Sequence, residues 1–427
     1  MRKQLSRLKL RQFLIIIAGC QVLLLLLLVL TWPRSPVIIS FVAPGLDYQP
    51  WFPLIEKFEK QNPDIKINLL KGPYTTDKVE AIYIAELQTN NPRYDIVYTD
   101  TVWLAQFAAR DFLLDISERI SAKELNKFLP ETIEVGSYKG KLYRLPLRSD
   151  VGVLYYRRDM LNGAGFFLPE TFNELKEISE NLQSKNEVEW GFLWQGSQYE
   201  GLVAVFVEIL KGYGGFWINS DTLEVGLDRP EAIQAVEFLR NTIQAGISPP
   251  EVTAYAEEES LEQFKEGKTL FLRSWPYAWA IINSQDSAIA GKVGIASTPN
   301  APGYSKSGCQ GGWGFSIAKN SKHPEEAWRV IEFFTSEEIQ RQLILDTGYM
   351  PSRKELFFEP EIVQTYPHFP LLFELLDNSV SRPNIAEYNL VSQILQRYLS
   401  QALRGASIKE TMAEAARETR EVLGKSL

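Results

Sequence analysis

The chain has 427 residues, enough for at least two core-bearing lobes, because single hydrophobic cores stop growing at about 250 to 300 residues. Its hydrophobic fraction of 45% and charged fraction of 23% are typical of a globular protein and argue against a disordered chain or a polytopic membrane protein. With 2 His, 2 Cys and none of the usual metal, nucleophile or phosphate-loop spacings, the sequence predicts no metal site and no cofactor.

The first 34 residues predict a membrane tether. Residues 1–12 carry five basic side chains and no acid, and an almost unbroken apolar run covers residues 13–32, the pattern of a signal peptide or signal anchor. Because basic residues stay in the cytoplasm, the rest of the chain is expected outside it, on the periplasmic side of the membrane. Two kinds of tether remain open: an uncleaved single span, and lipidation of Cys20, which ends a segment that resembles a bacterial lipobox.

The rest of the chain is acidic. The formal net charge of the whole chain is −8, and residues 1–34 contribute only bases, so the remainder is more negative still. Such a body is not expected to bind nucleic acid through a basic patch. If Cys20 stays in the tether, Cys309 has no disulfide partner.

After the tether, the sequence predicts alternating strands and helices. Apolar residues alternate over 37–42, fall at helical spacing over 51–58 and alternate again over 65–69. This strand, helix and strand form a βαβ unit, which implies a parallel sheet in a first α/β lobe. The pattern continues with a helix over 79–87, a strand over 94–98 and a helix over 102–109.

A second, helix-rich lobe is predicted after an extended run over residues 151–156. Helical apolar spacing recurs at 172–182, 202–210 and 233–243, and the middle helix is apolar enough to be buried. Further elements are expected as strands at 269–272, 292–296 and 313–318 and as helices at 327–334 and 408–422.

Three acidic residues lie close to the ends of predicted strands: Asp47, Asp100 and Asp150. Ligands of open α/β sheets bind outside the carboxyl ends of the strands, so at least Asp47 and Asp100 are expected to face one crevice. Asp100 also precedes a predicted helix, and capping of that helix is an alternative role for its carboxylate.

Aromatic residues accompany these acids. Trp275 and Tyr277 follow a predicted strand, and a loop leads to Gly312 and Trp313. Carboxylates accept hydrogen bonds from hydroxyl groups, and flat aromatic faces stack on C–H surfaces. Together these residue types predict an uncharged, polyhydroxylated ligand, which is a sugar.

The segments YDIVYTD at 94–100, WPYAW at 275–279 and GGW at 311–313 belong to a resemblance that covers nearly the whole body. Further matching segments follow in the same order at 51–60, 103–107, 140–157, 190–196, 198–201, 247–250 and 381–383. In these segments the chain resembles an extracytoplasmic solute-binding protein of a sugar ABC importer, and it is most similar to the trehalose/maltose-binding group.

This resemblance implies a two-lobed α/β fold, the type II periplasmic-binding-protein fold, in which each lobe is a sheet flanked by helices and crossing hinge segments join the lobes. After the tether at 1–34, lobe I is expected to comprise residues 36–147 and 292–335, and lobe II residues 148–291 and 336–427. The sugar is expected in the cleft, which closes by hinge motion. The resemblance implies a binding protein and not an enzyme.

Carried over position by position, the resemblance assigns sugar contacts to Asp47, Asp100, Asp150, Trp275, Tyr277, Gly312, Trp313, Arg382 and Tyr388. Arg148 joins this set because it stands where the family pattern leads us to expect a Tyr. Asp47 stands where a Glu is expected, and a basic pair expected near Val79 and Glu80 is absent. We therefore expect the ligand class to hold while the particular sugar differs.

The function that follows from the resemblance is capture of an α-linked disaccharide or related glycoside, of the trehalose, maltose, sucrose or glucosylglycerol type. The expected partners are the sugar, the transmembrane permease subunits with their cytoplasmic ATPase, and the membrane through the tether; a monomer is expected. Two alternatives remain open. A tethered glycoside hydrolase would also place two carboxyls around a sugar, and a sugar receptor for signalling would keep the same cleft.

Overall fold

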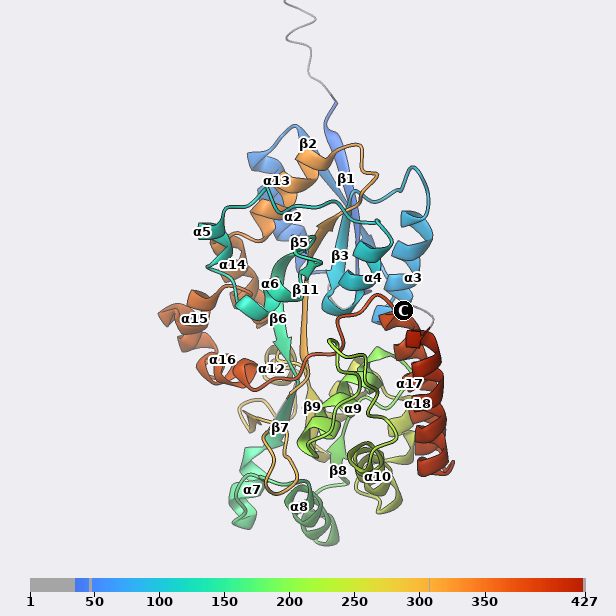
Figure 1. Cartoon of the computed structure of the whole chain (residues 1–427). Coiled ribbons are helices and arrows are strands. Elements are labelled where there is room, and N and C mark those ends of the chain that lie inside the picture. Colours follow the sequence, from blue (N-terminus) through green and yellow to red (C-terminus); the bar gives the residue numbers. More distant parts are fainter. Residues whose placement is uncertain (1–34, 46–47, 307, 425–427) are drawn as a thin grey trace, which may run out of the picture.

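The computed structural model describes residues 35–45, 48–306 and 308–424, which form two lobes, each built on β-strands with helices around them (Figure 1). The expected tether at 1–34, including Cys20, and the predicted site residue Asp47 lie outside these ranges. Within the ranges that are described, no helix is both long enough and apolar enough to span a membrane.

The first lobe begins with the predicted βαβ unit. β1 (Val37–Ala43) pairs in parallel with β2 (Ile65–Lys71), and α2 (Trp51–Gln61) connects them. The apolar face of α2 is buried, as its sequence spacing predicts. Its buried side chains recur every three or four residues, so they lie on the same side of the helix: Trp51, Leu54, Ile55 and Phe58. The next helix, α3 (Thr76–Leu87), begins at Thr76 rather than at residue 79.

A three-stranded sheet of this lobe is antiparallel, which the βαβ unit does not predict. β11 (Gln310–Ile317) lies between β3 (Ile96–Asp100) and β6 (Leu145–Val151) and runs antiparallel to both. The remaining elements around it are η2 (Thr101–Trp103), α4 (Leu104–Ala109), α5 (Ala122–Leu125), α6 (Pro130–Glu134), β4 (Ser137–Tyr138), β5 (Lys141–Leu142), α13 (Pro324–Phe334) and α14 (Glu337–Thr347).

The second lobe contains a four-stranded sheet in the order β10-β7-β9-β8. β7 (Val153–Arg157) is antiparallel to β9 (Thr269–Ser274) and to β10 (Val293–Ala296), whereas β8 (Trp190–Leu193) is parallel to β9. β10 therefore belongs to this sheet, which corrects the expected start of a lobe I segment at residue 292. The expected boundary between residues 147 and 148 is corrected too, because β6 continues in the first-lobe sheet to Val151. A short apolar strand does not reveal in its own sequence which sheet it joins.

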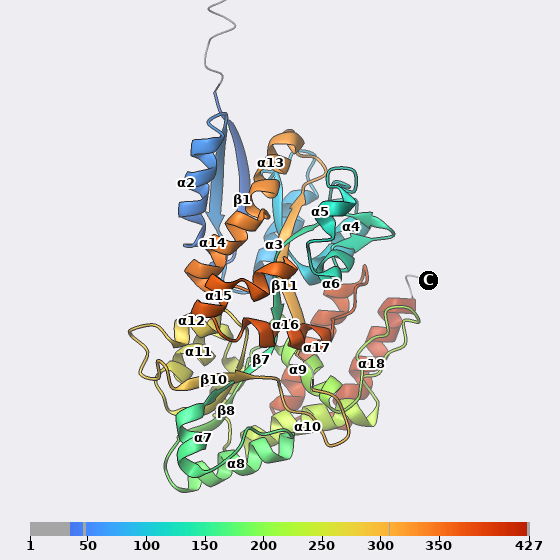
Figure 2. The same ribbon diagram turned by 90° about the vertical axis from the view of Figure 1, so that its left-hand side faces the viewer.

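Helices surround this second sheet (Figure 2). The predicted buried helix is α9 (Glu200–Gly212), in which all residues but Lys211 are buried. The others are α7 (Arg158–Ala164), α8 (Phe172–Ser184), α10 (Pro230–Gln244), α11 (Glu257–Lys265), α12 (Ala278–Ile282), α17 (Tyr388–Leu403) and α18 (Ile408–Gly424). α15 (Pro360–Thr365) and α16 (Phe369–Asp377) pack with α12 in a separate buried cluster.

Three segments of the chain run side by side between the lobes. Gly152, which separates β6 from β7, donates its N–H to the carbonyl of Cys309 at 2.9 Å. Val380, between α16 and α17, donates to the carbonyl of Gly308 at 2.9 Å. A Cβ at Gly152 would lie 1.6 Å from Oε1 of Glu208, so this crossing needs glycine. The expected two-lobed α/β fold with crossing segments is confirmed.

Candidate binding site between the lobes

A cavity between the two lobes encloses about 700 Å³ of empty space, part of which is open to solvent. We call it the interlobe cavity. Its walls are formed by Pro44, Tyr74, Thr76, Asp100, Arg148, Asp150, Tyr199, Glu200, Gly201, Glu257, Trp275, Tyr277, Gly311, Gly312, Trp313 and Arg382.

Eight of the ten predicted site residues line this cavity: Asp100, Arg148, Asp150, Trp275, Tyr277, Gly312, Trp313 and Arg382. Asp47 lies outside the described residues. Tyr388 is buried at the start of α17 and does not line the cavity, so the structure does not bring it together with the others.

The pairing of β11 with its two neighbours positions the first-lobe wall. In the register of this sheet, Trp313 is paired with Asp100 of β3 on one side and with Arg148 of β6 on the other, while Gly311 is opposite Asp150. Asp100 and Asp150 lie within β3 and β6, whereas the sequence places them just outside strands, and Trp313 lies in a strand as predicted. One register thus brings two carboxylates, one guanidinium and one indole to the same wall.

Gly312 has a left-handed backbone with φ of 142°. A Cβ at this position would lie 2.7 Å from the carbonyl oxygen of Arg148. Glycine is therefore required here because β11 and β6 approach each other so closely.

Asp100 caps the turn that follows it and also lines the cavity. It is the residue before η2, and its Oδ1 accepts hydrogen bonds from the hydroxyl of Thr101 at 3.0 Å and from the N–H of Val102 at 3.4 Å. The same oxygen lies 3.9 Å from Nη2 of Arg382. The carboxylate is thus fixed by its own turn while it faces the cavity.

Arg148 is held against the wall by a carboxylate and by aromatic rings. Its Nε lies 3.6 Å from Oδ2 of Asp150. Its guanidinium lies over the ring of Tyr349 at 4.2 Å and over that of Trp313 at 5.8 Å. Cation–π contact at these distances fixes the guanidinium plane, so its N–H groups keep a set direction.

Trp275 forms the second-lobe wall directly after β9, and its indole is fixed on two sides. Nε1 donates to Oε1 of Glu257 at 3.2 Å, and the hydroxyl of Tyr199 donates to Oε2 of the same carboxylate at 2.6 Å. The guanidinium of Arg273 lies against the indole at 4.2 Å. These contacts orient a flat aromatic face toward the cavity.

Glu200, the first residue of α9, links the cavity wall to the layer behind it. It accepts from Nη1 of Arg382 at 2.6 Å, from the hydroxyl of Ser392 at 2.6 Å and from the hydroxyl of Tyr388. Burial raises the pKa of the Glu200 carboxyl, and the nearby Arg382 opposes this rise. Tyr388 therefore acts on the cavity through Glu200.

The sequence did not single out Tyr74, Thr76, Tyr199, Glu200 or Glu257. Tyr74 and Thr76 follow β2, and the rule on carboxyl ends of strands that selected Asp100 would have found them. Tyr199 and Glu200 lie in a segment that carries the resemblance. Glu257 opens a strongly acidic helix and has no local signal of its role.

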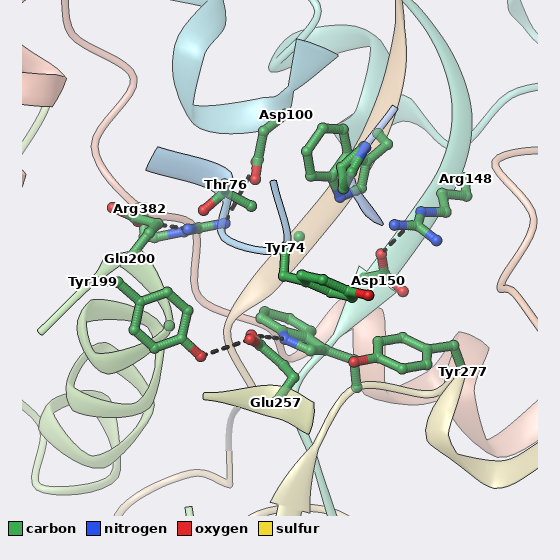
Figure 3. Close-up of a pocket in the computed structure, with 16 residues that line it drawn as sticks. Tyr74, Thr76, Asp100, Arg148, Asp150, Tyr199, Glu200, Glu257, Tyr277 and Arg382 are labelled. Carbon is green, nitrogen blue, oxygen red and sulfur yellow. Dashed lines mark hydrogen bonds and ion pairs between the residues drawn. The ribbon is translucent and has the colours of Figure 1, made fainter. Parts of the chain in front are cut away.

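The close-up in Figure 3 shows how these side chains are arranged. Asp100, Arg382 and Glu200 lie toward one side, Arg148, Asp150 and Tyr277 toward the other, and Tyr74 lies between them. Acceptors, donors and aromatic faces alternate around one space, which can satisfy hydroxyl groups and cover C–H faces of one ligand.

The fold and this site define a class: two-lobed proteins with a polar, aromatic cavity between the lobes. The family model described as bacterial extracellular solute-binding protein matches residues 45–341. The chain belongs to this family, which confirms the family expected from the sequence. It is a family of binding proteins, whose members act outside the cytoplasm.

Individual relatives agree with this assignment. A probable ABC transporter-binding protein of Deinococcus radiodurans is 31% identical over 334 residues, which are 76% of this chain and 79% of that protein. A maltotriose-binding protein of Pyrococcus abyssi is 28% identical over 315 residues, 72% of this chain and 64% of that protein. The solved structure of maltose-bound T. maritima MalE3 has a TM-score of 0.86 and 32% identity, covering 90% of this chain and 100% of its own.

Proposed function

We propose that this chain is the sugar-capturing subunit of an ABC importer and that the interlobe cavity holds an α-linked disaccharide or related glycoside. The observation that carries the proposal is the wall itself, in which the carboxylates of Asp100 and Asp150 and the indole of Trp275 line one cavity. Carboxylates and guanidinium groups match the hydroxyls of a sugar, and the indole face matches its C–H surface.

The two lobes contribute different parts of this recognition. Asp100, Asp150 and Trp313 come from strands of the first lobe, and Trp275 and Tyr277 follow a strand of the second. A ligand that contacts both walls favours the state in which the lobes are together, because only that state makes both sets of contacts. The closed form would then deliver the sugar to the permease.

The sugars named for two similar proteins support a glucose-based ligand. The Pyrococcus abyssi protein is named for maltotriose, and the T. maritima structure contains maltose. Arg148, with its fixed guanidinium, places donors on the cavity wall where an aromatic hydroxyl is expected from the resemblance. We propose that this difference selects among maltose, trehalose, sucrose and glucosylglycerol types.

We also propose that the N-terminal segment tethers the protein to the membrane, by an uncleaved span or by lipidation of Cys20. The basic and then apolar pattern of residues 1–32 supports this. Detergent partitioning of the full chain, followed by mass spectrometry of its N-terminal peptide, distinguishes the two forms.

The binding proposal is tested by a thermal-shift screen of the full chain against di- and trisaccharides, glucosylglycerol and polyols, followed by calorimetry. A bound sugar is expected to raise the unfolding midpoint. In calorimetry, Trp275→Ala and Asp100→Ala are each expected to weaken binding by at least 100-fold, or about 2.8 kcal/mol.

Phe167→Ala is the matched control for Trp275→Ala, because Phe167 is 92% exposed and lies outside the cavity. It should keep wild-type affinity. Wild-type affinity in both cavity variants would overturn the site assignment, and release of glucose during incubation with maltose, trehalose or sucrose would favour a hydrolase instead.

A further inference from the structure

Arg144 is a fully buried cation behind the first-lobe wall. It immediately precedes β6 and does not line the interlobe cavity. Its Nε donates to the carbonyl of Thr99 at 3.2 Å, whereas its Nη1 and Nη2 have no hydrogen-bond partner among the described residues. A buried charge that is not fully paired lowers the stability of a fold, and departures of this kind occur mostly where function requires them.

The register of the sheet places Arg144 against the back of this wall. Thr99 is paired with Gly314, and the next pair along the two strands is Asp100 and Trp313, which line the interlobe cavity. Successive residues of a strand point to opposite faces, so a side chain at Gly314 would point away from Trp313. A Cβ at Gly314 would lie 2.8 Å from Nε of Arg144, which places the guanidinium on that opposite face.

The carboxylate on which this charge acts is that of Asp100. Thr99, whose carbonyl accepts the hydrogen bond from Arg144, is joined to Asp100 by its peptide bond. Burial lowers the pKa of Arg144 from its ordinary value to about 10, and among the charged groups around it Asp100 opposes this fall most. Because this pKa is well above 7, Arg144 carries its positive charge at neutral pH.

Asp100 is buried and still has one oxygen to offer a ligand. Its Oδ1 accepts from Thr101 and Val102, whereas Oδ2 accepts no hydrogen bond from any of the described residues. Arg382 lies 3.9 Å from Oδ1 at the cavity, and Arg144 lies behind the strand. Two positive charges thus compensate the negative charge of Asp100, and a charged acceptor binds hydroxyl groups more strongly than a neutral one.

We propose that Arg144 is a positioning residue for the sugar: from behind the wall, its charge holds the carboxylate of Asp100 as the charged acceptor for a hydroxyl of the ligand. This inference rests on the proposed sugar-binding function. It adds a residue that neither contacts the sugar nor lines its cavity. The buried charge is kept at a cost to folding because the binding site uses it.

The test separates sugar binding from stability in the full chain. Arg144→Met keeps an apolar chain in the buried space and removes the charge. We expect it to weaken binding of maltose, trehalose or sucrose, whichever wild type binds most tightly, by about tenfold in calorimetry. Its unfolding midpoint in urea should equal or exceed that of wild type, because replacing a buried charge with an apolar group is often neutral or stabilising.

Two further variants serve as controls for the charge. Arg144→Lys keeps the positive charge without the planar guanidinium and should bind the sugar within about threefold of wild type. Arg110→Met removes an exposed arginine of the same lobe and should change neither affinity nor stability.

Asp100→Asn shows whether the effect passes through Asp100. In this background, Arg144→Met should change the affinity by less than about twofold, because no negative charge remains for Arg144 to compensate. A tenfold loss that persists beside Asp100→Asn would overturn the proposed route through this carboxylate.

Wild-type affinity in Arg144→Met, or an equal loss in Arg144→Met and Arg144→Lys, would also overturn the inference. If Arg144→Met does not fold, Arg144→Gln replaces it, because it keeps an amide donor for the carbonyl of Thr99 without the charge. Failure of both variants to fold would assign Arg144 to the fold alone and overturn the proposal. Absence of binding to all three sugars in wild type would instead overturn the proposed function on which the inference rests.

Discussion

Glu80 is a buried carboxyl at the contact between α3 and α17. Burial raises its pKa from the ordinary value of 4.5 to about 8, and the nearby carboxylates of Asp77 and Glu200 add to this rise. Nδ2 of Asn389 donates to its Oε2 at 2.6 Å, which opposes the rise. The native protein therefore holds a proton between about pH 4.5 and pH 8 that the unfolded chain releases.

Stability is expected to fall as the pH rises through this window. Because the native state binds more protons than the unfolded state there, the free energy of unfolding decreases with pH, on the order of 1 kcal/mol per pH unit from this group. Glu80→Gln keeps the shape and an acceptor oxygen but not the titration. Urea unfolding at pH 5, 6.5 and 8 should show a shallower pH dependence in this variant than in wild type.

Glu258→Gln is the control for this measurement, since Glu258 is exposed on α11. Its unfolding free energies should run parallel to those of wild type. Parallel curves for Glu80→Gln as well would show that Glu80 does not titrate between these pH values.

At the residue scale, the prediction from sequence agrees with the structure for polar or aromatic residues that lie at the end of a strand. Trp275 and Tyr277 were predicted from a strand end and line the cavity there. Tyr388 was carried over from the resemblance, yet the structure places it one layer behind, with its hydroxyl on Glu200. A local sequence pattern does not distinguish a side chain that lines the cavity from one that lies behind it, such as Tyr388. Side chains of both kinds are buried and carry a polar group at one end.

At the scale of elements, α9 and β9 are joined by a buried ion pair. Nε of Arg273 lies 2.9 Å from Oε2 of Glu208, and both side chains are fully enclosed. Glu208 also accepts the N–H of Cys309 at 3.0 Å, and Arg273 lies against Trp275. The pair thus connects a crossing segment to the cavity wall.

Glu208→Ala is expected to lower the free energy of unfolding by about 3 to 5 kcal/mol, because it leaves a buried guanidinium uncompensated. It should also weaken sugar binding, since Arg273 then no longer holds the indole in place. Chemical unfolding and calorimetry check the two effects. Glu237→Ala, at an exposed position of α10, is the control, and an equally small effect of both substitutions would contradict this role of the pair.

Most elements could be predicted from their periodicity, but their pairing could not. The helices α2, α8 and α10 have the apolar spacing that the sequence shows. In contrast, β11 pairs with β3 and β6, which are far from it in sequence, and this pairing is what assembles the first-lobe wall. The register between strands that are distant in sequence is determined by the packing of the whole sheet, so no local sequence pattern predicts it.

On the scale of the whole molecule, polar contacts join the lobes beside the cavity. Oδ1 of Asp77 accepts the N–H of Glu200 at 3.1 Å, and its Oδ2 accepts from Gln396 at 3.0 Å. These contacts connect α3 of the first lobe to α9 and α17 of the second. The length of the chain alone predicts two lobes. The way in which the lobes face each other depends on the three crossing segments, and no local sequence pattern predicts how these segments pair.

The buried thiol of Cys309, in the second crossing segment, can be used to detect separation of the lobes. Cys309 is completely buried, and burial raises its pKa to about 12. In the native protein its reaction with iodoacetamide at pH 8 is expected to be much slower than in the unfolded chain, because burial keeps the reagent out and disfavours the thiolate, which is the reacting form.

Sugar should slow this alkylation further, since reagent reaches Cys309 when the crossing segments separate. Peptide mass spectrometry of the Cys309 peptide follows the reaction in the full chain, separately from Cys20. An alkylation rate that sugar leaves unchanged would contradict the proposed link between lobe opening and access to Cys309. A rate that falls with sugar would report hinge opening in the native protein, without any introduced label.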